Sequence, residues 1–258
     1  MATPRLLTIP ISHYCEKVRW ALERAGVDYV EEAHLQMIHR FYAVKAGGGR
    51  KVPVLITDEG VFNESSEIIR WIDERLPVER RLVPADLRPR IDAIEGRLDE
   101  GLGVEGRRWM YSMLMTTDLP RRYGLGPLPR WERAAVPVVL PVMRLYLKAF
   151  MDAEPAKAAD ALASVDEAFD WIEELIADGR PYLVGDRFTS ADLTFAALSA
   201  AVLAPERYGV ELPQPEDAPP GIRREMERLR ERPAGRFAAR LVAEERPWPP
   251  ANRPARVN

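Results

Sequence analysis

The sequence predicts an α/β domain followed by an all-helical domain, and two observations carry this prediction. Between residues 5 and 76, short runs of β-forming residues alternate with segments of helical period, in the order β-α-β-α-β-β-α. Beyond residue 89 the β signal almost disappears, and residues 158–176 keep apolar side chains at the 3.6-residue period through several turns. We therefore expect one domain over residues 1–79, a linker over 80–89 and a helical domain over 90–245.

The first domain divides into seven expected elements. They run over residues 6–9, 15–25, 29–33, 36–46, 52–56, 61–62 and 65–76. In the first helix Val18, Ala21 and Leu22 fall at i, i+3 and i+4, and Gly26 is placed to end it. Pro77 is placed to end the last helix, since proline cannot continue one.

The second domain is expected to consist of helices alone. They are predicted over residues 90–117, 131–151, 158–176, 190–203 and 223–243. Pro137 and Pro141 each remove a backbone donor, so the second of these helices should bend or start late. Residues 246–258 contain four prolines and no acid, and we expect an extended, flexible tail there.

Composition narrows the functional classes. The 258 residues are 47% apolar and 30% charged, an ordinary globular balance. The single cysteine, Cys15, excludes an internal disulfide and favours a reducing, cytoplasmic location. A net charge of −3 disfavours a nucleic-acid partner. The longest uncharged stretch, residues 193–205, is far shorter than the roughly 18 residues of a membrane span, so no membrane partner is expected.

The first candidate site lies where the first strand gives way to the first helix. Ser12 and Cys15 face the backbone N–H groups and the positive dipole end of that helix, which stabilise an anion. A thiolate bound there would have a lowered pKa, and the Ser12 hydroxyl could donate a hydrogen bond to its sulfur. The alternative is that Ser12 only caps the helix and Cys15 is a small core residue.

Two further dipeptides stand at the starts of elements. Pro53 cannot donate to the sheet, and a cis Val52–Pro53 bond would leave the Val52 backbone free to pair with an extended ligand. At the last helix of the domain, Ser65 and nearby N–H groups could hold a carboxylate while Glu64 accepts from an ammonium. Simple strand initiation and an ordinary helix cap are the alternatives.

These three features, in this order and on this pattern, resemble the cytosolic glutathione transferase superfamily over nearly the whole chain. The first domain then resembles a thioredoxin-like, thiol-binding domain. Residues 182–193 look like the helix-capping signature of the superfamily's helical domain. That segment also has a physical basis, since Thr189 can serve as the N-cap and Asp192 as its N3 partner in a capping box.

The resemblance implies a role for each matching residue. Ser12 would activate the thiol, as in the serine-type, theta-like classes. The Val52 backbone would pair with the cysteinyl part of glutathione, with Pro53 as the cis-proline. Glu64 and Ser65 would hold the γ-glutamyl end. The cations that could reach the glycyl carboxylate are Lys51, the equally placed Arg50 and, less securely, His39.

Other positions limit or extend this assignment. Cys15 occupies the second position of a Cys-x-x-Cys pattern, which argues against cysteine-type thiol transfer, and Tyr14 follows Ser12 on the helix side, away from the position of a catalytic tyrosine. An acceptor pocket between the domains would be lined by residues such as Trp109, Met110, Tyr111 and Met113. The segment 119–129 could form either a lid or a closed-off acceptor site.

The leading hypothesis is an enzyme that adds glutathione, or a related thiol, to an electrophile, as in detoxification, with the thiol as cosubstrate and no metal. A noncatalytic ligand-binding or protein-interaction module is the alternative, and thiol–disulfide exchange through Cys15 a weaker one. The resemblance also implies a homodimer, in which helix 65–76 of one subunit meets helix 90–117 of the other. Trp71 and Arg97 are suited to such a partly polar interface.

Overall fold

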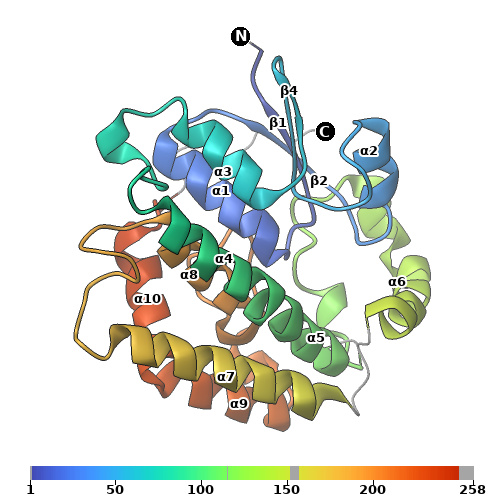
Figure 1. The fold of residues 1–258 in the computed structure, drawn as a ribbon. Helices are drawn as coiled ribbons and strands as arrows, with labels where there is room; N and C mark the ends of the chain where they lie inside the picture. Colours follow the sequence, from blue (N-terminus) through green and yellow to red (C-terminus); the bar gives the residue numbers. More distant parts are fainter. Residues whose placement is uncertain (1, 115, 152–156, 250–258) are drawn as a thin grey trace.

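A computed structural model describes residues 2–114, 116–151 and 157–249. The first domain has the predicted order of elements (Figure 1). They are β1 (Arg5–Thr8), α1 (His13–Ala25), β2 (Val30–Ala33), α2 (His39–Lys45), β3 (Val54–Thr57), β4 (Gly60–Phe62) and α3 (Ser65–Asp73).

The strands form one mixed sheet in the order β2-β1-β3-β4. β1 pairs parallel with β2 and antiparallel with β3, and β3 pairs antiparallel with β4. In this register Leu7 faces Val54. Helices α1 and α3 pack together and against the helical domain (Figure 1). Because β1 and β4 are both antiparallel to β3, the start of α1, the residues before β3 and the start of α3 lie at the same end of the strands. The motifs at Ser12, Val52–Pro53 and Glu64–Ser65 stand at these three places.

The second domain contains helices, turns and loops, and no strand among its described residues. Its helices are α4 (Arg88–Glu100), α5 (Leu102–Leu114), α6 (Arg130–Met151), α7 (Ala158–Ile176), α8 (Ser190–Leu203), α9 (Pro220–Glu231) and α10 (Pro233–Glu245), with short 3-10 turns η1 (Val78–Arg80), η2 (Leu119–Arg121) and η4 (Pro215–Asp217). α8 is buried along nearly its whole length and contacts α1, α4, α5 and α10. α6 stands apart from this bundle and lies near α2 (Figure 1).

Two predicted long helices are each divided in two. Residues 90–117 form α4 and α5, which meet at Gly101, where the backbone has φ −90° and ψ −91° and a Cβ would lie 2.9 Å from the Arg97 carbonyl oxygen. Residues 223–243 divide at Pro233, which starts α10 and forces Arg232 into an extended conformation. In both places local backbone chemistry overrides an apolar period that runs across the break.

The helix predicted to bend or start late at its prolines is instead assigned as one continuous helix. α6 runs from Arg130 to Met151 with both Pro137 and Pro141 inside it. Each proline leaves the carbonyl four residues earlier without its helical partner. Both prolines are exposed, so this side of the helix faces solvent, which can satisfy the freed carbonyls.

One hydrophobic core connects the two domains. It contains Trp20, Ile68 and Ile72 from the first domain together with Leu98, Phe169 and Phe195 from the second. The apolar contact between α1 and α8 is therefore continuous with the interior of each domain. Among the described helices, none combines the length and the apolar character that a membrane span requires.

The expected tail begins differently from the prediction. Arg246, its first residue, is 2% exposed, donates from Nε to Glu16 at 3.0 Å and also pairs with Glu23. A buried guanidinium needs such carboxylate partners, and both come from α1, more than 220 residues earlier in the chain. Residues 250–258 of the expected tail lie outside the described residues.

Candidate functional site

Ser12 caps the N-terminus of α1. It has the extended φ and ψ of an N-cap, −72° and 122°, and its Oγ accepts from the Cys15 N–H at 3.4 Å. The side chain is partly exposed, at the end of a helix of 13 residues. The local sequence explains this geometry, because Pro10 ends β1 and Ser12 prefers the cap to the helix interior. A hydroxyl and the first-turn N–H groups are thus presented together to a ligand.

Cys15 points away from solvent. Its side chain is 0% exposed, and burial raises the pKa of its thiol despite the opposing influence of the Arg19 guanidinium and a hydrogen bond with Ser12. A thiol held in the protonated form inside the core is a poor nucleophile. The geometry therefore agrees with Cys15 as a core residue and disfavours thiol–disulfide exchange through it.

Tyr14 contacts the helical domain. Its hydroxyl donates to the Asp99 carbonyl oxygen at 2.8 Å, and burial raises its pKa. The ring fills the space over Gly103, where a Cβ would lie 2.2 Å from the Tyr14 hydroxyl oxygen. His13 beside it is also buried, which lowers its pKa to about 3 and keeps it neutral. Both side chains connect the domains, and neither is presented to a thiol beside Ser12.

The Val52–Pro53 peptide bond is cis. Val52 is partly exposed and precedes the first residue of β3, so it lies outside the ladder that pairs β3 with β1. Glu64 is the N-cap of α3, is exposed, and makes no side-chain cap hydrogen bond. Ser65, the next residue, is 7% exposed. The backbone N–H groups that start α3 are therefore not capped by the Glu64 side chain, an arrangement that suits an anion.

The three candidate cations differ in exposure. Arg50 and Lys51 are exposed on the connection between α2 and β3. His39 is 5% exposed, and burial lowers its pKa to about 4, so its ring is neutral near pH 7. Burial and a neutral ring disfavour His39 as a cation for the ligand carboxylate, and its assignment to that group stays a prediction. Arg50 and Lys51 keep the charge and the access that the role requires.

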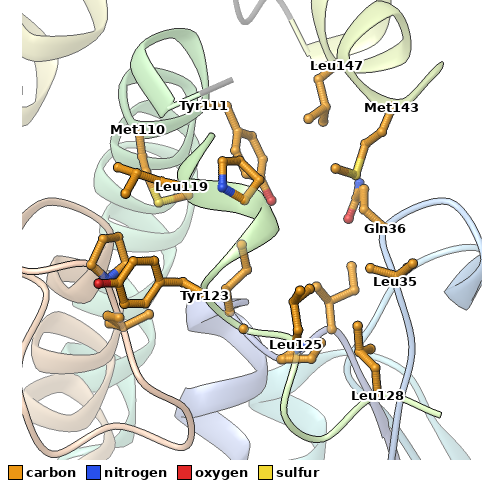
Figure 2. Close-up of a pocket in the computed structure, with 17 residues that line it drawn as sticks. Leu35, Gln36, Met110, Tyr111, Leu119, Tyr123, Leu125, Leu128, Met143 and Leu147 are labelled. Atoms are coloured by element: carbon orange, nitrogen blue, oxygen red, sulfur yellow. The ribbon is translucent and has the colours of Figure 1, made fainter. Parts of the chain in front are cut away.

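An apolar cavity lies immediately beside the Ser12 segment (Figure 2). It has a volume of about 90 Å³. Its walls come from six stretches of the chain: Ile9, Pro10 and Ile11 before Ser12; Leu35 and Gln36 before α2; Met110 and Tyr111 on α5; Leu119, Pro120, Tyr123, Gly124, Leu125 and Leu128 on η2 and the loop after it; Met143 and Leu147 on α6; and Leu212 and Pro213 on the loop before α9. No charged side chain is among these lining residues.

The predicted pocket residues are only partly those observed. Met110 and Tyr111 line the cavity, whereas Trp109 is 2% exposed and packs in the main core. These neighbours on α5 point in different directions, because successive residues of a helix are rotated by about 100°. The Met113 side chain lies outside the described residues. The contributions of Gln36, Met143 and Leu147 were not predicted, since only the docking of α6 brings them together.

The segment 119–129 forms one wall of the cavity and lies against Ile11, the residue before Ser12. Gly124 has φ +72°, and a Cβ on it would lie 2.4 Å from the Ile11 side chain. A second loop contributes from the far side, where the Tyr208 hydroxyl donates to the Ile11 carbonyl oxygen at 3.0 Å. The segment 119–129 thus packs on the loop that precedes Ser12, and both of its predicted roles, a lid and a closed-off acceptor site, stay predictions.

A buried polar contact joins α6 to the first domain. Glu132 is 0% exposed, accepts from the Leu35 N–H at 2.7 Å, and lies 2.6 Å from Nδ1 of His34. The His34 ring in turn stacks on Tyr42, with ring centroids 3.6 Å apart. Because Leu35 and Gln36 line the cavity, this contact sets the position of one cavity wall relative to the other.

Comparisons with known proteins agree on one family. Residues 6–80 match the model of the glutathione S-transferase N-terminal domain, and residues 154–229 match that of the glutathione S-transferase C-terminal domain. The chain belongs to the glutathione S-transferase superfamily. No curated protein matches it in sequence.

Solved glutathione S-transferase structures share the fold at low identity. One from Ceriporiopsis subvermispora, in complex with glutathione, has a TM-score of 0.63 and 16% identity, covering 94% of this chain and 96% of that one. Human glutathione S-transferase T1-1 in its apo form has a TM-score of 0.63 and 15% identity, covering 94% and 84%. A possible glutathione S-transferase from Rhodopseudomonas palustris has a TM-score of 0.61 and 14% identity, covering 95% of each chain.

The candidate site of this glutathione S-transferase falls partly inside and partly outside the segments that the two family models match. Ser12, Val52, Pro53 and Ser65 lie within the matched N-terminal segment. The cavity walls from α5, α6 and the 119–129 segment lie between the two matched segments. The residues predicted to bind the thiol therefore lie in a part of the chain that a family model matches, whereas much of the cavity wall is built by a part that neither model describes.

Proposed function

We propose that the protein is a serine-type, theta-like glutathione transferase, which adds the thiol of glutathione, or of a related small thiol, to an electrophile. Ser12 is the catalytic residue of this proposal. The observation that carries it is the position of Ser12, partly exposed at the N-terminus of α1 and directly after the three residues that line the apolar cavity.

The remaining thiol-site residues support this proposal by their position. Val52 lies outside the ladder with its backbone next to a cis-proline, and the start of α3 at Ser65 offers N–H groups to a carboxylate. Glu64 is exposed beside them and can accept from an ammonium. Arg50 or Lys51 would hold the carboxylate at the opposite end of the tripeptide. Structures similar in fold were solved with glutathione bound, from Methylobacillus flagellatus and Ceriporiopsis subvermispora.

The chemistry requires a thiolate beside an electrophile. The thiol proton leaves to water, the sulfur forms a bond to the electrophilic carbon, and the electron pair of the broken bond departs with the leaving group, a halide for an aryl halide acceptor. A hydrogen bond from the Ser12 hydroxyl and the dipole of α1 both favour the thiolate over the thiol. Because the cavity walls carry no charged side chain, the preferred acceptor is an uncharged, apolar electrophile.

The experiment has a binding arm and a turnover arm. Glutathione and one alternative thiol are titrated by calorimetry, and turnover is measured with an aryl halide. Ser12→Ala should lower turnover at least about tenfold, the loss of one charge-assisted hydrogen bond of roughly 1.4 kcal/mol. Cys15→Ala is the matched control one turn into the same helix, and it should keep most of the turnover.

Each outcome distinguishes the hypotheses. Unchanged turnover in Ser12→Ala would remove Ser12 from the mechanism. Failure of every thiol to bind the folded protein would instead favour a noncatalytic interaction module. Loss of a disulfide-reductase activity in Cys15→Ala, with Ser12→Ala still active, would favour thiol exchange.

A cytoplasmic homodimer with a detoxifying role is also part of the proposal. In the proposed dimer, α3 of one subunit meets α4 and α5 of the other. Two of the expected interface residues, Trp71 and Arg97, also contact aromatic rings of their own chain. Trp71 is 7% exposed beside Phe62, and the Arg97 guanidinium lies 4.0 Å from the centre of the Trp171 ring. Light scattering at micromolar concentration should give twice the 29.2 kDa chain mass, and a single 29.2 kDa species would refute the dimer alone.

A further inference from the structure

An exposed apolar surface runs along α6 and continues onto α2. We call it the α2–α6 face and define it by Phe41, Val44, Trp131, Val138, Val142 and Leu145. The exposed fraction reaches 76% at Val138, 70% at Leu145 and 67% at Phe41. Single exposed apolar residues are ordinary, but a row of them on one helix marks a surface with a use. None of the six lines the cavity.

The helix geometry explains why this row has no partner within the chain. Positions 131, 138, 142 and 145 share one side of α6, separated by seven, four and three residues. The opposite side carries the buried Val136, Leu140, Met143 and Leu147, which form clusters with residues of the first domain and of α5. α6 is thus apolar on both sides, and only the inner side is covered by the protein.

α2 extends the surface from the first domain. Arg40 donates to the Tyr146 hydroxyl at 3.1 Å, so the two helices are neighbours. Phe41 and Val44, which follow Arg40 on α2, are both exposed. In Figure 1 the two helices lie at the same edge of the molecule, away from the bundle of α4, α5 and α7–α10.

The two segments that carry this face are rich in basic residues and poor in acids. Residues 34–51 contain no acid, and the only acid within α6 is Glu132, which is 0% exposed against His34. The basic residues of the same segments are Arg40, Lys45, Arg50, Lys51, Arg130, Arg133, Arg144 and Lys148. This concentration contrasts with the net charge of −3 for the whole chain. An occupant of the face therefore has to be apolar where it meets the row and anionic around it.

We propose that the α2–α6 face attaches the protein to an anionic lipid surface. An amphipathic helix with Trp and aliphatic residues on one side and Lys or Arg beside them lies in the headgroup region of such a membrane. A second copy of the chain fits less well, because a twofold contact would bring the same basic residues together without acids. The apolar side chains of α6 are also strongly exposed, and such side chains can insert among lipids without a matching groove on a partner protein.

The proposal differs from the expectation that no membrane partner exists. That expectation rested on the lack of a membrane span, and attachment to a surface requires none. It also differs from the proposed transferase function in the residues that carry it, since none of the six apolar residues of the face belongs to the cavity or to the thiol site.

The test uses the full chain and two kinds of vesicle. Cosedimentation is measured with pure phosphatidylcholine and with phosphatidylcholine containing about a third phosphatidylglycerol. The protein should bind the anionic vesicles, with less binding as added salt shortens the range of the charges. Val142→Glu with Leu145→Glu should lower binding at least about tenfold, because each places an acid where an apolar side chain meets the lipid.

A matched control comes from another exposed valine. Val78 in η1 is 64% exposed and belongs neither to α2 nor to α6, so Val78→Glu should bind as the wild type does. Melting temperatures check that each variant is folded. Trp131, 55% exposed, adds a spectroscopic readout, since its fluorescence should shift to the blue with anionic vesicles and the shift should be lost in Trp131→Phe.

Three results would overturn the proposal. The first is wild-type protein that ignores anionic vesicles, and the second is equal binding by the folded Val142→Glu, Leu145→Glu variant. The third is a wild-type dimer that the same double substitution converts to a monomer in light scattering without any vesicle binding, which would make the face a contact between copies. Equal binding to neutral vesicles would overturn the part of the proposal that depends on charge.

Discussion

Two groups of polar residues on α1 have opposite surroundings. Ser12, at the start of the helix, is partly exposed and touches the protein through a long contact with the Cys15 N–H. Glu16, Arg19 and Glu23, one to three turns later, are buried and paired with charged partners. The same helix therefore has a partly exposed hydroxyl with one long hydrogen bond at its start, and buried side chains with several charged partners along its length. The first arrangement suits a ligand, and the second suits a fixed structure.

The buried group forms one connected network. Arg19 lies 2.6 Å from Glu31 and 3.3 Å from Glu16, and Glu16 also accepts from the Gly209 N–H at 3.0 Å. Arg246 closes the network by pairing with both Glu16 and Glu23. The network thereby joins α1 to the loop before α9, through Gly209, and to the segment after α10, through Arg246.

The largest expected effect comes from breaking this network. Arg246→Ala would leave two carboxylates buried without their main cation, and removing one partner of a buried pair destabilises a protein by about 3–5 kcal/mol. We expect that loss in urea unfolding. Affinity for glutathione, counted per folded molecule, should stay unchanged, because Arg246 contacts Glu16 and Glu23 and none of the residues proposed to bind the thiol.

The comparison is sharpened by a control and by the reverse experiment. Arg224→Ala, at an exposed position on α9, should change stability little. Ser12→Ala should lower turnover while leaving stability nearly intact. A marked loss of thiol affinity in folded Arg246→Ala would mean that the two groups on α1 are coupled.

The order of the elements could be predicted from sequence because their signals are local, and the residues proposed to bind the thiol stand at the ends of those elements. The positions of Ser12, Pro53 and Ser65 follow from strand and helix ends a few residues away. The role of Arg246 could not be predicted, since its partners lie more than 220 residues away and a proline-rich segment is typical of a tail. For His39, residue type indicated a surface cation, whereas packing buried the ring and removed its charge.

The cavity shows the same limit. Apolar residues of α5 indicated a pocket, but a periodic pattern does not say which apolar side meets the core. Trp109 turned to the core and Tyr111 to the cavity. The docking of α6 depends on Glu132, whose contacts with His34 and Leu35 span about a hundred residues.

A smaller effect is expected at a second buried acid. Asp192 is 0% exposed and accepts from the Leu183 N–H at 2.7 Å and the Thr189 N–H at 2.9 Å, in the predicted capping box of α8. Asp192→Ala leaves both donors unsatisfied and should destabilise the protein by about 1–3 kcal/mol. Thr189→Ala removes only the cap side chain and should cost roughly 0.5–2 kcal/mol. Unchanged thermal unfolding in both variants would contradict this account of the cap.

The same residue gives a pH dependence. Burial raises the pKa of Asp192 to about 6 from an ordinary 3.8, so between these values the folded protein holds a proton that the unfolded chain has lost. The contribution of Asp192 to stability is therefore present below pH 3.8 and is lost as the pH rises through about 6. Relative to Asp192→Asn, the wild type should lose stability from pH 4 to 6 and then level off. A flat difference across this range would show that the carboxylate is ionised throughout.

The smallest expected effects concern the exposed cations of the thiol site. Lys51→Ala and Arg50→Ala each remove a solvated charge, and exposed ion pairs contribute about 0.2–1 kcal/mol, so affinity for glutathione should fall by no more than about fivefold. The residue that pairs with the glycyl carboxylate should show the larger loss, and added salt should reduce it.

His39 provides the test of burial against residue type. Because its ring is neutral near pH 7, His39→Gln removes no charge, and the folded variant should bind glutathione as tightly as the wild type. Lys45→Ala, exposed on α2, is the control for a nearby charge outside the thiol site. If His39→Gln weakened binding more than Lys51→Ala did, with a loss that shrank in salt, the ring would have to carry charge in the complex. The rule that exposed polar groups bind the ligand and buried ones hold the structure would then not apply to His39.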